Sequence, residues 1–264
     1  MENTYWHKQT STQALYDDML WNKPQQRNLA GKLAIIGGNA QGFNSVSLGY
    51  NFAQKAGIGI NRTLMPDSLK KVIGKSWPEC EFSLSTKSGG FSSRSLADWL
   101  SISEWADGVL LSGDLGQNSE TSILLEHYIH QYNGKLNLTG DSVNIALGSP
   151  LQLLEKNTLT LTVDLSQLQK FVTAIRFPSA IKSSMSLIQL VDLLHSLSQS
   201  YDISLITLYE GQAIVADQGQ ISSTAIPANT TALQLAAVAS VWQLQQPTKI
   251  FEAMTTAMFE LNNP

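Results

Sequence analysis

Cysteine, charge and long apolar runs are all scarce in this chain of 264 residues. Its single cysteine, Cys80, excludes a disulfide framework and a cysteine-based zinc site. No run approaches the roughly 18 apolar residues that a membrane span needs, and the polar N-terminal residues lack the apolar core of a signal peptide. We therefore expect a cytoplasmic protein that contacts no membrane.

Charged residues make up only 14% of the chain, against about 25% in an average soluble domain. The 17 lysines and arginines are outnumbered by 21 acidic residues, so the chain lacks the positive charge that binds nucleic acid. A surface with so little charge does little to oppose self-association. We therefore expect a homo-oligomer and no nucleic-acid partner.

What the chain does contain is a regular alternation of short apolar runs and helical patterns, which is typical of an α/β fold with a parallel sheet. The predicted strands are 33–36, 59–64, 81–86, 108–111, 135–139, 158–163 and 203–208. The predicted helices are 45–56, 96–106, 119–132, 141–147, 165–174, 187–197, 232–244 and 250–261. A small β-hairpin is predicted from 212–216 and 221–225. We predict one domain over residues 31–264, with residues 1–30 as a helical extension packed on it.

A glycine-rich segment, GGNAQG at residues 37–42, lies between a predicted strand and a predicted helix. Backbone N–H groups and the positive helix end can hold an anion there. Asn39 occupies the place of the second glycine in G-x-G-x-x-G, which disfavours a Rossmann dinucleotide site. The alternative is that Gly37 and Gly38 form a turn that lets the helix approach the sheet.

Two more polar loops follow predicted strands, SGDLG at residues 112–116 and the stretch 141–144. Open α/β sheets bind ligands at the carboxyl ends of their strands, so two such loops on one sheet edge predict a cleft. Asp141 is also predicted to cap the helix that follows it.

Two histidines, His127 and His130, stand beside Glu126 at a helical spacing that a metal site could use. No third ligand accompanies them, and the apolar ridge of the same helix lies elsewhere, so an exposed polar face is favoured. We predict no metal site.

Three segments of the chain resemble ADP/ATP-dependent NAD(P)H-hydrate dehydratases. GKLAIIGGN at 31–39 resembles the opening of that family, and ADGVLLSGDLG at 106–116 resembles its Gly-Pro-Gly-Leu-Gly loop. LNLTGDSVN at 136–144 resembles its strand and cap, Leu-Val-Leu-Asp-Ala-Asp-Ala-Leu-Asn. The resemblance covers nearly the whole chain from about residue 31 and implies a ribokinase-like three-layer fold, whose central, mostly parallel sheet is flanked by helices.

The resemblance also implies ligands and a reaction. ATP or ADP with Mg²⁺ would be the cofactor, and NAD(P)H or its hydrate would be the ligand. In the family the nucleotide phosphorylates the hydroxyl of the hydrate, and elimination of phosphate then restores the nicotinamide ring.

The chain departs from the family where phosphoryl transfer is expected. The family's Gly-Ser/Thr-Gly-Asp, at the start of the penultimate helix, is Ala-Asn-Thr-Thr at 228–231, so Thr231 stands in the position of the aspartate that activates the hydroxyl. The family's Leu-Lys-Gly is Leu-Tyr-Glu-Gly at 208–211, where Glu210 would repel phosphate. Asp114 replaces the central glycine of the second loop, and Thr139 replaces the first aspartate of the third.

We therefore predict a divergent homologue of the dehydratases, with weak or lost activity and no assigned catalytic residue. The predicted substrate- or nucleotide-binding residues are Gly37, Gly38, Asn39, Gly113, Asp114, Leu115, Gly116, Asp141 and Asn144. The first three are expected to face a nicotinamide-bearing substrate, and the others are expected to line the cleft near phosphate or metal. One alternative is a non-catalytic nucleotide-binding or structural, oligomeric protein. Another is a ribokinase-like small-molecule kinase, which the missing Gly-x-Gly-Asp segment disfavours.

Overall fold

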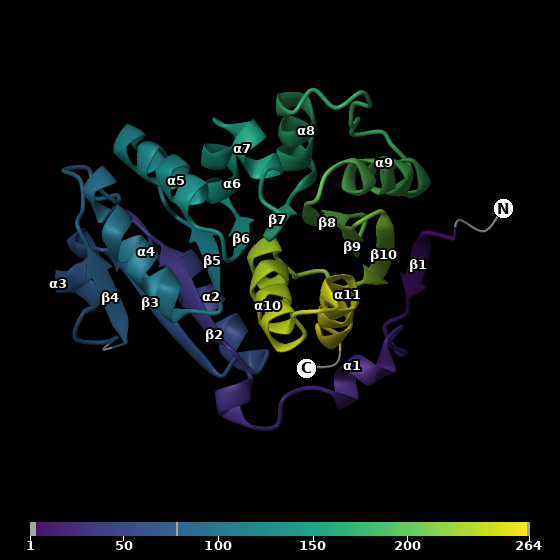
Figure 1. Ribbon diagram of the computed structural model, residues 1–264, viewed down its shortest axis with the longest axis horizontal. Coiled ribbons are helices and arrows are strands. Elements are labelled where there is room, and N and C mark those ends of the chain that lie inside the picture. Colours follow the sequence, from purple (N-terminus) through teal and green to yellow (C-terminus); the bar gives the residue numbers. More distant parts are fainter. Residues whose placement is uncertain (1–3, 78, 263–264) are drawn as a thin grey trace.

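The computed structural model describes residues 4–77 and 79–262, which form a central sheet between two layers of helices (Figure 1). Within these residues ten strands join one sheet. The strands are β1 (Trp6–Gln9), β2 (Lys32–Gly37), β3 (Ile60–Pro66), β4 (Cys80–Ser83), β5 (Gly108–Gly113), β6 (Lys135–Thr139), β7 (Leu159–Val163), β8 (Ser204–Tyr209), β9 (Gln212–Asp217) and β10 (Gln220–Ala225). The predicted three-layer α/β architecture is confirmed.

The sheet order is β1-β10-β9-β8-β7-β6-β5-β2-β3-β4. The neighbouring strands from β8 to β4 are all parallel, whereas β9 pairs antiparallel with both β8 and β10. The predicted hairpin is therefore confirmed as β9 and β10. Its turn has positive φ at Gln218 (47°) and Gly219 (79°), which suits the right-handed twist of a tight hairpin. At the centre of the sheet β2, β5 and β6 are neighbours, so the loops after them meet at one edge.

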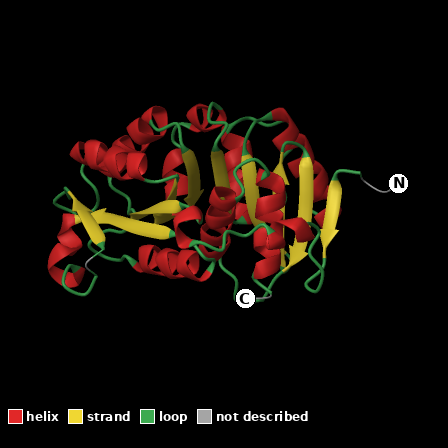
Figure 2. Cartoon of the chain, turned by 60° about the horizontal axis from the view of Figure 1, so that its bottom comes forward, coloured by secondary structure: helices red, strands yellow, loops and turns green. Residues whose placement is uncertain are grey.

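The helices cover both faces of the sheet, as the red and yellow elements of Figure 2 show. They are α1 (Asp17–Trp21), α2 (Asn44–Lys55), α3 (Lys70–Ile73), α4 (Leu96–Trp105), α5 (Ser119–Gln131), α6 (Asp141–Ala146), α7 (Pro150–Leu154), α8 (Leu165–Ala174), α9 (Leu187–Ser200), α10 (Ala232–Gln245) and α11 (Ile250–Glu260). Short 3-10 turns occupy Arg27–Leu29, Asp67–Leu69 and Ser93–Ser95.

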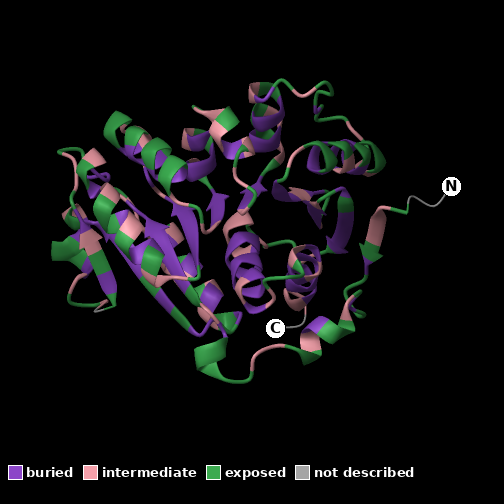
Figure 3. Cartoon of the chain, viewed as in Figure 1, coloured by how far each residue is buried: buried purple, intermediate pink, exposed green. Residues whose placement is uncertain are grey.

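Successive residues of a central strand pack into different cores, because side chains of a strand alternate between the two faces. Ala34 and Ile36 of β2 join the core beneath α4, α5, α8 and α9. Leu33 and Ile35 of the same strand join the core beneath α2, α10 and α11. The central strands are therefore buried on both faces, and they are purple in Figure 3.

The helix α10 is buried on all sides. Every residue from 235 to 243 is buried, since the helix lies on the sheet and also packs against α2 and α11. This explains a segment that is apolar all round rather than amphipathic. Within the described residues no helix has both the length and the apolar composition needed to cross a bilayer.

The predicted helical extension over residues 1–30 is wrong for Trp6–Gln9, which form a strand, β1, parallel to β10. Residues 1–3 of that extension lie outside the described residues. Backbone groups of β10 at the edge of the sheet need partners, and β1 supplies them. The buried Gln9 anchors the strand, since its Nε2 donates to Thr255 O (2.7 Å) and to Thr224 Oγ1 (3.0 Å). A strand of four residues is too short to show a periodic pattern.

Candidate functional site

The loops that follow β2 and β5 are joined by hydrogen bonds at the carboxyl edge of the sheet. Gly38 N donates to Gly113 O (3.1 Å), and Asn39 Nδ2 donates to Asp114 O (2.6 Å). The loop after β6 joins them through Asp141. The structure thus brings the three predicted loops together, as expected for neighbouring parallel strands.

Glycines at this edge permit a close approach of β2 and β5. A Cβ at Gly37 would lie 2.5 Å from Gly113 O and 2.7 Å from Ser112 Oγ, so no larger residue fits without a shift. Gly38 and Gly113 have φ of 87° and 101°, a region that glycine enters at no steric cost. None of these three glycines lines either pocket described below. Their part in the site is the backbone geometry that they allow.

Asp141 ties the start of α6 to the loop after β5. Its Oδ2 accepts a hydrogen bond from Gly116 N (3.0 Å), and its Oδ1 accepts one from Leu115 N (3.3 Å). The prediction that Asp141 caps its own helix is wrong, because Gly140 is the N-cap residue and no side chain caps α6. The carboxylate instead satisfies backbone N–H groups of the neighbouring loop, which would otherwise be unpaired.

Several influences act on the pKa of the Asp141 carboxyl group, including a hydrogen bond from its own backbone that lowers it. Burial raises the pKa of its carboxyl group, and this is the largest effect. The hydrogen bonds from Gly116 and Leu115 lower the pKa, while the nearby Asp114 carboxylate raises it. The net result is a raised pKa, so burial outweighs the hydrogen bonds.

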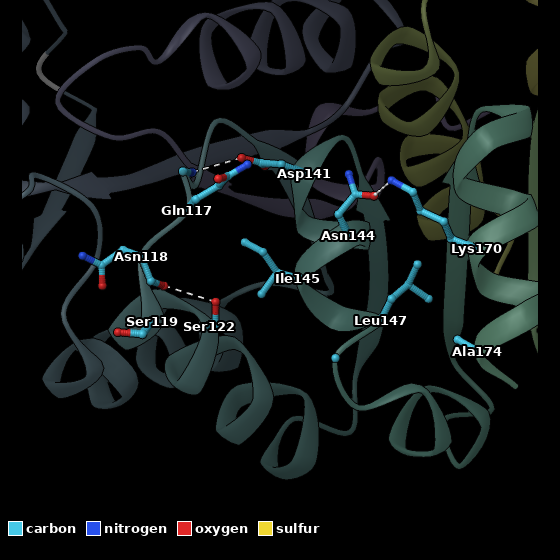
Figure 4. Close-up of a pocket in the computed structure, with 12 residues that line it drawn as sticks. Gln117, Asn118, Ser119, Ser122, Asp141, Asn144, Ile145, Leu147, Lys170 and Ala174 are labelled. Atoms are coloured by element: carbon cyan, nitrogen blue, oxygen red, sulfur yellow. Dashed lines mark hydrogen bonds between the residues drawn. The ribbon is translucent and has the colours of Figure 1, made fainter.

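A pocket of about 840 Å³, here called the first pocket, opens between α5, α6 and α8 (Figure 4). It is lined by Gly116, Gln117, Asn118, Ser119, Ser122, Asp141, Asn144, Ile145, Leu147, Gly148, Lys170 and Ala174. Among these residues Lys170 is the only cation, and its Nζ donates to Asn144 Oδ1 (3.4 Å). The volume is typical of a ligand site, and Lys170 can attract a negatively charged group.

A second pocket of about 490 Å³ lies on the other side of residues 116–118. It is lined by Asn39, Gln41, Ser88, Gly90, Leu115, Gly116, Gln117, Asn118 and Asp141. None of these lining residues is a lysine or arginine, and four of the nine carry side-chain amides. Ser88 comes from the loop between β4 and α4, and its Oγ accepts a hydrogen bond from Asn118 Nδ2 (2.5 Å). This pocket is polar without a positive side chain.

The first turn of α2 is paired with a negatively charged group of the protein itself, the Asp114 carboxylate. Asp114 Oδ2 accepts a hydrogen bond from Ser45 N (2.8 Å) in the first turn of α2. The N-cap residue Phe43 provides no side-chain hydrogen bond. Asp114 has φ of 55°, in the left-handed region that favours glycine. Asp114 therefore places a carboxylate against the positive end of α2.

Thr231 caps α10, and its Oγ1 accepts a hydrogen bond from Gln234 N (3.2 Å). The first turn of α10, all of it described, contains no acidic residue. Thr231 lines neither of the two pockets. Glu210 lies in the tight turn between β8 and β9 with φ of 47°. The structure therefore gives Thr231 a capping role and Glu210 a turn position.

The histidines of α5 lie on the exposed side of that helix. His127 and His130 are exposed, which confirms the interpretation of a polar face. Glu126 beside them accepts a hydrogen bond from Ser149 Oγ (2.7 Å). In the part of the chain that the structure describes, no three His, Cys, Asp or Glu side chains gather into a group that could hold a metal.

Sequence reasoning missed several residues that line the pockets, above all Lys170, Gln117 and Gln41. Lys170 lies on α8, and helical periodicity shows which side of a helix is exposed but not which loop faces it. Asn118 could have been noticed, because Asn before a helix is a common N-cap and its side chain does accept from Glu120 N (2.8 Å).

The sheet order and the two helical layers give this chain a ribokinase-like α/β fold. A solved ribokinase-like superfamily protein from Enterococcus faecalis V583 superposes with a TM-score of 0.70 and 14% identity, covering 99% of this chain and 88% of that one. The ADP/ATP-dependent NAD(P)H-hydrate dehydratase from Bacillus subtilis, co-crystallised with ATP and Mg²⁺ and soaked with CoA, has a TM-score of 0.62. It is 11% identical and covers 95% of this chain and 87% of its own.

A protein from Streptococcus mutans is similar to the same degree as the first, with a TM-score of 0.70, 14% identity and coverage of 95% and 89%. No protein-family profile matches the sequence, and no curated protein matches it. At these identities the likeness shows the fold, and the predicted ribokinase-like fold is confirmed.

Proposed function

We propose that this chain binds a nucleotide or dinucleotide in its two pockets and performs nucleotide-driven dehydration of NAD(P)H hydrate weakly or not at all. The observation that carries the second part of this proposal, weak or absent turnover, is the use of Thr231 as the N-cap of α10. An alcohol does not act as a general base near neutral pH, and its oxygen here already accepts a backbone hydrogen bond. The resemblance implies a carboxylate at this position.

The shape and chemistry of the cleft support ligand binding. The first pocket offers Lys170 to an anionic group and Asn144 to a hydrogen-bonding group, with Ile145 and Leu147 as apolar contacts. The second pocket continues on the other side of residues 116–118 with amide side chains. A ligand that combines phosphates with polar, uncharged rings suits such a two-part cleft.

Mg²⁺ is best treated as part of the nucleotide ligand. Among the described residues no cluster of metal-binding side chains exists, and both oxygens of Asp141 accept backbone hydrogen bonds. Because Mg²⁺ is commonly held by substrate phosphates with one or two carboxylates, a nucleotide–Mg²⁺ complex needs no cage supplied by the protein. Only Asp141 among the residues lining the first pocket is acidic.

Thermal unfolding with ATP, ADP, NADH or NADPH, each with and without Mg²⁺, tests binding. A ligand at about 100 times its Kd should stabilise the folded chain by about 2.7 kcal/mol. Ala174→Trp, which fills the first pocket, should abolish the shift. Thr173→Trp adds the same side chain at an exposed neighbour on α8 and should leave the shift unchanged. No shift with any ligand, or an undiminished shift in Ala174→Trp, contradicts the proposal.

Turnover of hydrated NADH with ATP or ADP tests the catalytic part. The unmodified chain should show little or no activity, whereas Thr231→Asp combined with Thr230→Gly should raise it. Aspartate is also a good N-cap, so the double variant should fold. Thr231→Ser keeps the hydroxyl and should gain nothing. Activity in the unmodified chain that survives Thr231→Ala would place the catalytic groups elsewhere and overturn the role given to this position.

A further inference from the structure

We propose that a third pocket, formed between α2, α10 and α11, binds a small carboxylate whose other end is apolar. The pocket has a volume of about 370 Å³, which lies in the range of small-molecule sites. It shares no lining residue with the first or the second pocket. The site is therefore separate from the cleft at the carboxyl edge of the sheet and independent of the proposed function.

One wall of the third pocket is apolar and consists of Phe52, Ala56, Val238 and Leu261. Ala56 and Val238 are buried because α2 packs against α10, whereas Phe52 and Leu261 are half-buried. The helices α10 and α11 lie side by side in Figure 1, and the pocket opens where the ends of α2 and α11 approach the first half of α10. An apolar ligand segment on this wall removes its own surface and that of the wall from water, which favours binding.

The acidic residue of the third pocket, Glu260, is already paired within the protein. Its Oε1 accepts a hydrogen bond from Lys23 Nζ (2.6 Å), and its Oε2 accepts one from Trp242 Nε1 (2.8 Å). Lys23 Nζ also lies 5.2 Å from the centroid of the Trp242 ring. Both carboxylate oxygens thus have a donor, and the charges of Lys23 and Glu260 offset each other.

The other two polar residues of the third pocket, Lys55 and Gln234, have side chains without a partner. Neither side chain makes a hydrogen bond or an ion pair with any described residue. Lys55 is exposed in the last turn of α2, and Gln234 is half-buried in the first turn of α10. Since the lining contains two lysines and one glutamate, it carries one excess positive charge. A ligand with a single negative charge balances it.

A monocarboxylate suits both parts of the third pocket. Its oxygens can accept hydrogen bonds from Lys55 Nζ and Gln234 Nε2, while its apolar end covers the apolar wall. The excess positive charge opposes a cationic ligand. A phosphate dianion has more negative charge than the single unpaired lysine offsets, and Glu260 stands in the same lining.

Titration calorimetry with octanoate tests the proposal, with 1-octanol as the uncharged ligand of the same chain length. Octanoate should bind more tightly than 1-octanol. Lys55→Ala should weaken octanoate binding about threefold to tenfold, because it removes a charged donor, and should leave 1-octanol binding unchanged. Lys71→Ala is the matched control, since Lys71 is also an exposed lysine in the last turn of a helix and lines none of the three pockets. It should leave octanoate binding unchanged.

Two tryptophan variants test the location of the site. Gln234→Trp fills the third pocket and should abolish octanoate binding. Ala174→Trp places the same side chain in the first pocket and should leave octanoate binding unchanged. Thermal unfolding of each variant reports whether it is folded. The lysine variants change exposed positions, so they test the proposal even where Gln234→Trp does not fold.

No binding of octanoate, equal binding of octanoate and 1-octanol, or an equal loss in Lys55→Ala and Lys71→Ala would overturn the proposal. Binding that survives in folded Gln234→Trp, or that Ala174→Trp abolishes, would place octanoate elsewhere and overturn it as well. These titrations contain no nucleotide, so their outcome is distinct from that of the nucleotide experiments.

Discussion

Asp141 Oδ2 and the backbone nitrogen of Gly116 lie 3.0 Å apart and join two loops that follow neighbouring strands, β5 and β6. This contact holds residues 116–118 between the two pockets, and Gly116 and Asp141 line both of them. Gly116 has φ of 77°, and a Cβ there would lie 3.2 Å from Asn39 Nδ2. This hydrogen bond is therefore one of those that connect the loops of the candidate site.

Asp141 should give the stability of the chain a pH dependence of defined sign. Because the pKa of its carboxyl group is raised by burial above 3.8, the folded chain binds the proton more tightly than the unfolded chain. The resulting stabilisation is fully present below the unfolded pKa and is lost as the pH rises through the folded pKa. Asp141→Asn removes this contribution. The unfolding free energy of the unmodified chain minus that of Asp141→Asn should therefore fall as the pH rises from below 3.8 towards neutral.

Urea unfolding at several pH values measures that difference. Asp107→Asn controls for the loss of one exposed carboxylate at the other edge of the sheet. A difference that increases with pH would contradict the expected sign.

Gly37→Ala should destabilise the chain by about 1–3 kcal/mol, the usual cost of forcing extra atoms into a packed region. The new Cβ would meet Gly113 O at 2.5 Å. Gly42→Ala is the matched control, because nothing lies within 4 Å of a Cβ built there. Chemical denaturation of both variants gives the comparison. Equal stability of the two would show that β2 and β5 can separate at little cost.

Gln9→Ala should cost about 1–3 kcal/mol, because it removes the buried hydrogen bonds of the Gln9 amide to Thr255 O and Thr224 Oγ1. It should also loosen β1, since Gln9 Oε1 accepts from Leu15 N (3.0 Å). Gln13→Ala, an exposed glutamine in the same segment, should change stability little. Hydrogen exchange of β10 amides should rise in Gln9→Ala alone, and unchanged protection there would argue against an anchoring role.

Thr231→Ala should lower stability by about 1 kcal/mol through loss of the N-cap of α10. Thr231→Ser retains an oxygen that can accept from Gln234 N and should restore most of that loss. Thermal unfolding of the two variants measures the effect. If both lose the same stability, the methyl group of Thr231 rather than its hydroxyl is what matters.

A homo-oligomer stays a prediction from the low charge of the chain. Apolar side chains at several exposed positions agree with it, including Trp21 (84% exposed), Leu29 (65%) and Leu151 (67%). Size-exclusion chromatography with light scattering should give a multiple of 28.8 kDa. A monomer of 28.8 kDa at micromolar concentration would contradict the prediction.

Much of the fold could be predicted because buried strands and amphipathic helices leave local patterns. The helix predicted at residues 165–174 matches α8 (Leu165–Ala174), and the strand predicted at 135–139 matches β6 (Lys135–Thr139). Both have periodic apolar residues bounded by polar residues or turns. β1 was missed because its partner strand, β10, is more than 200 residues away along the chain.

The α/β alternation and the loops expected at one sheet edge could be predicted from the amino-acid pattern alone, because alternating strand and helix periodicities favour a parallel sheet. Which groups meet across those loops, and the order of the strands, became known from the three-dimensional structure. Asp114 turns to the start of α2, Asp141 turns to Gly116, and Lys170 reaches the first pocket from α8. Hydrogen bonds and charge interactions between distant segments depend on three-dimensional placement, which no local pattern encodes.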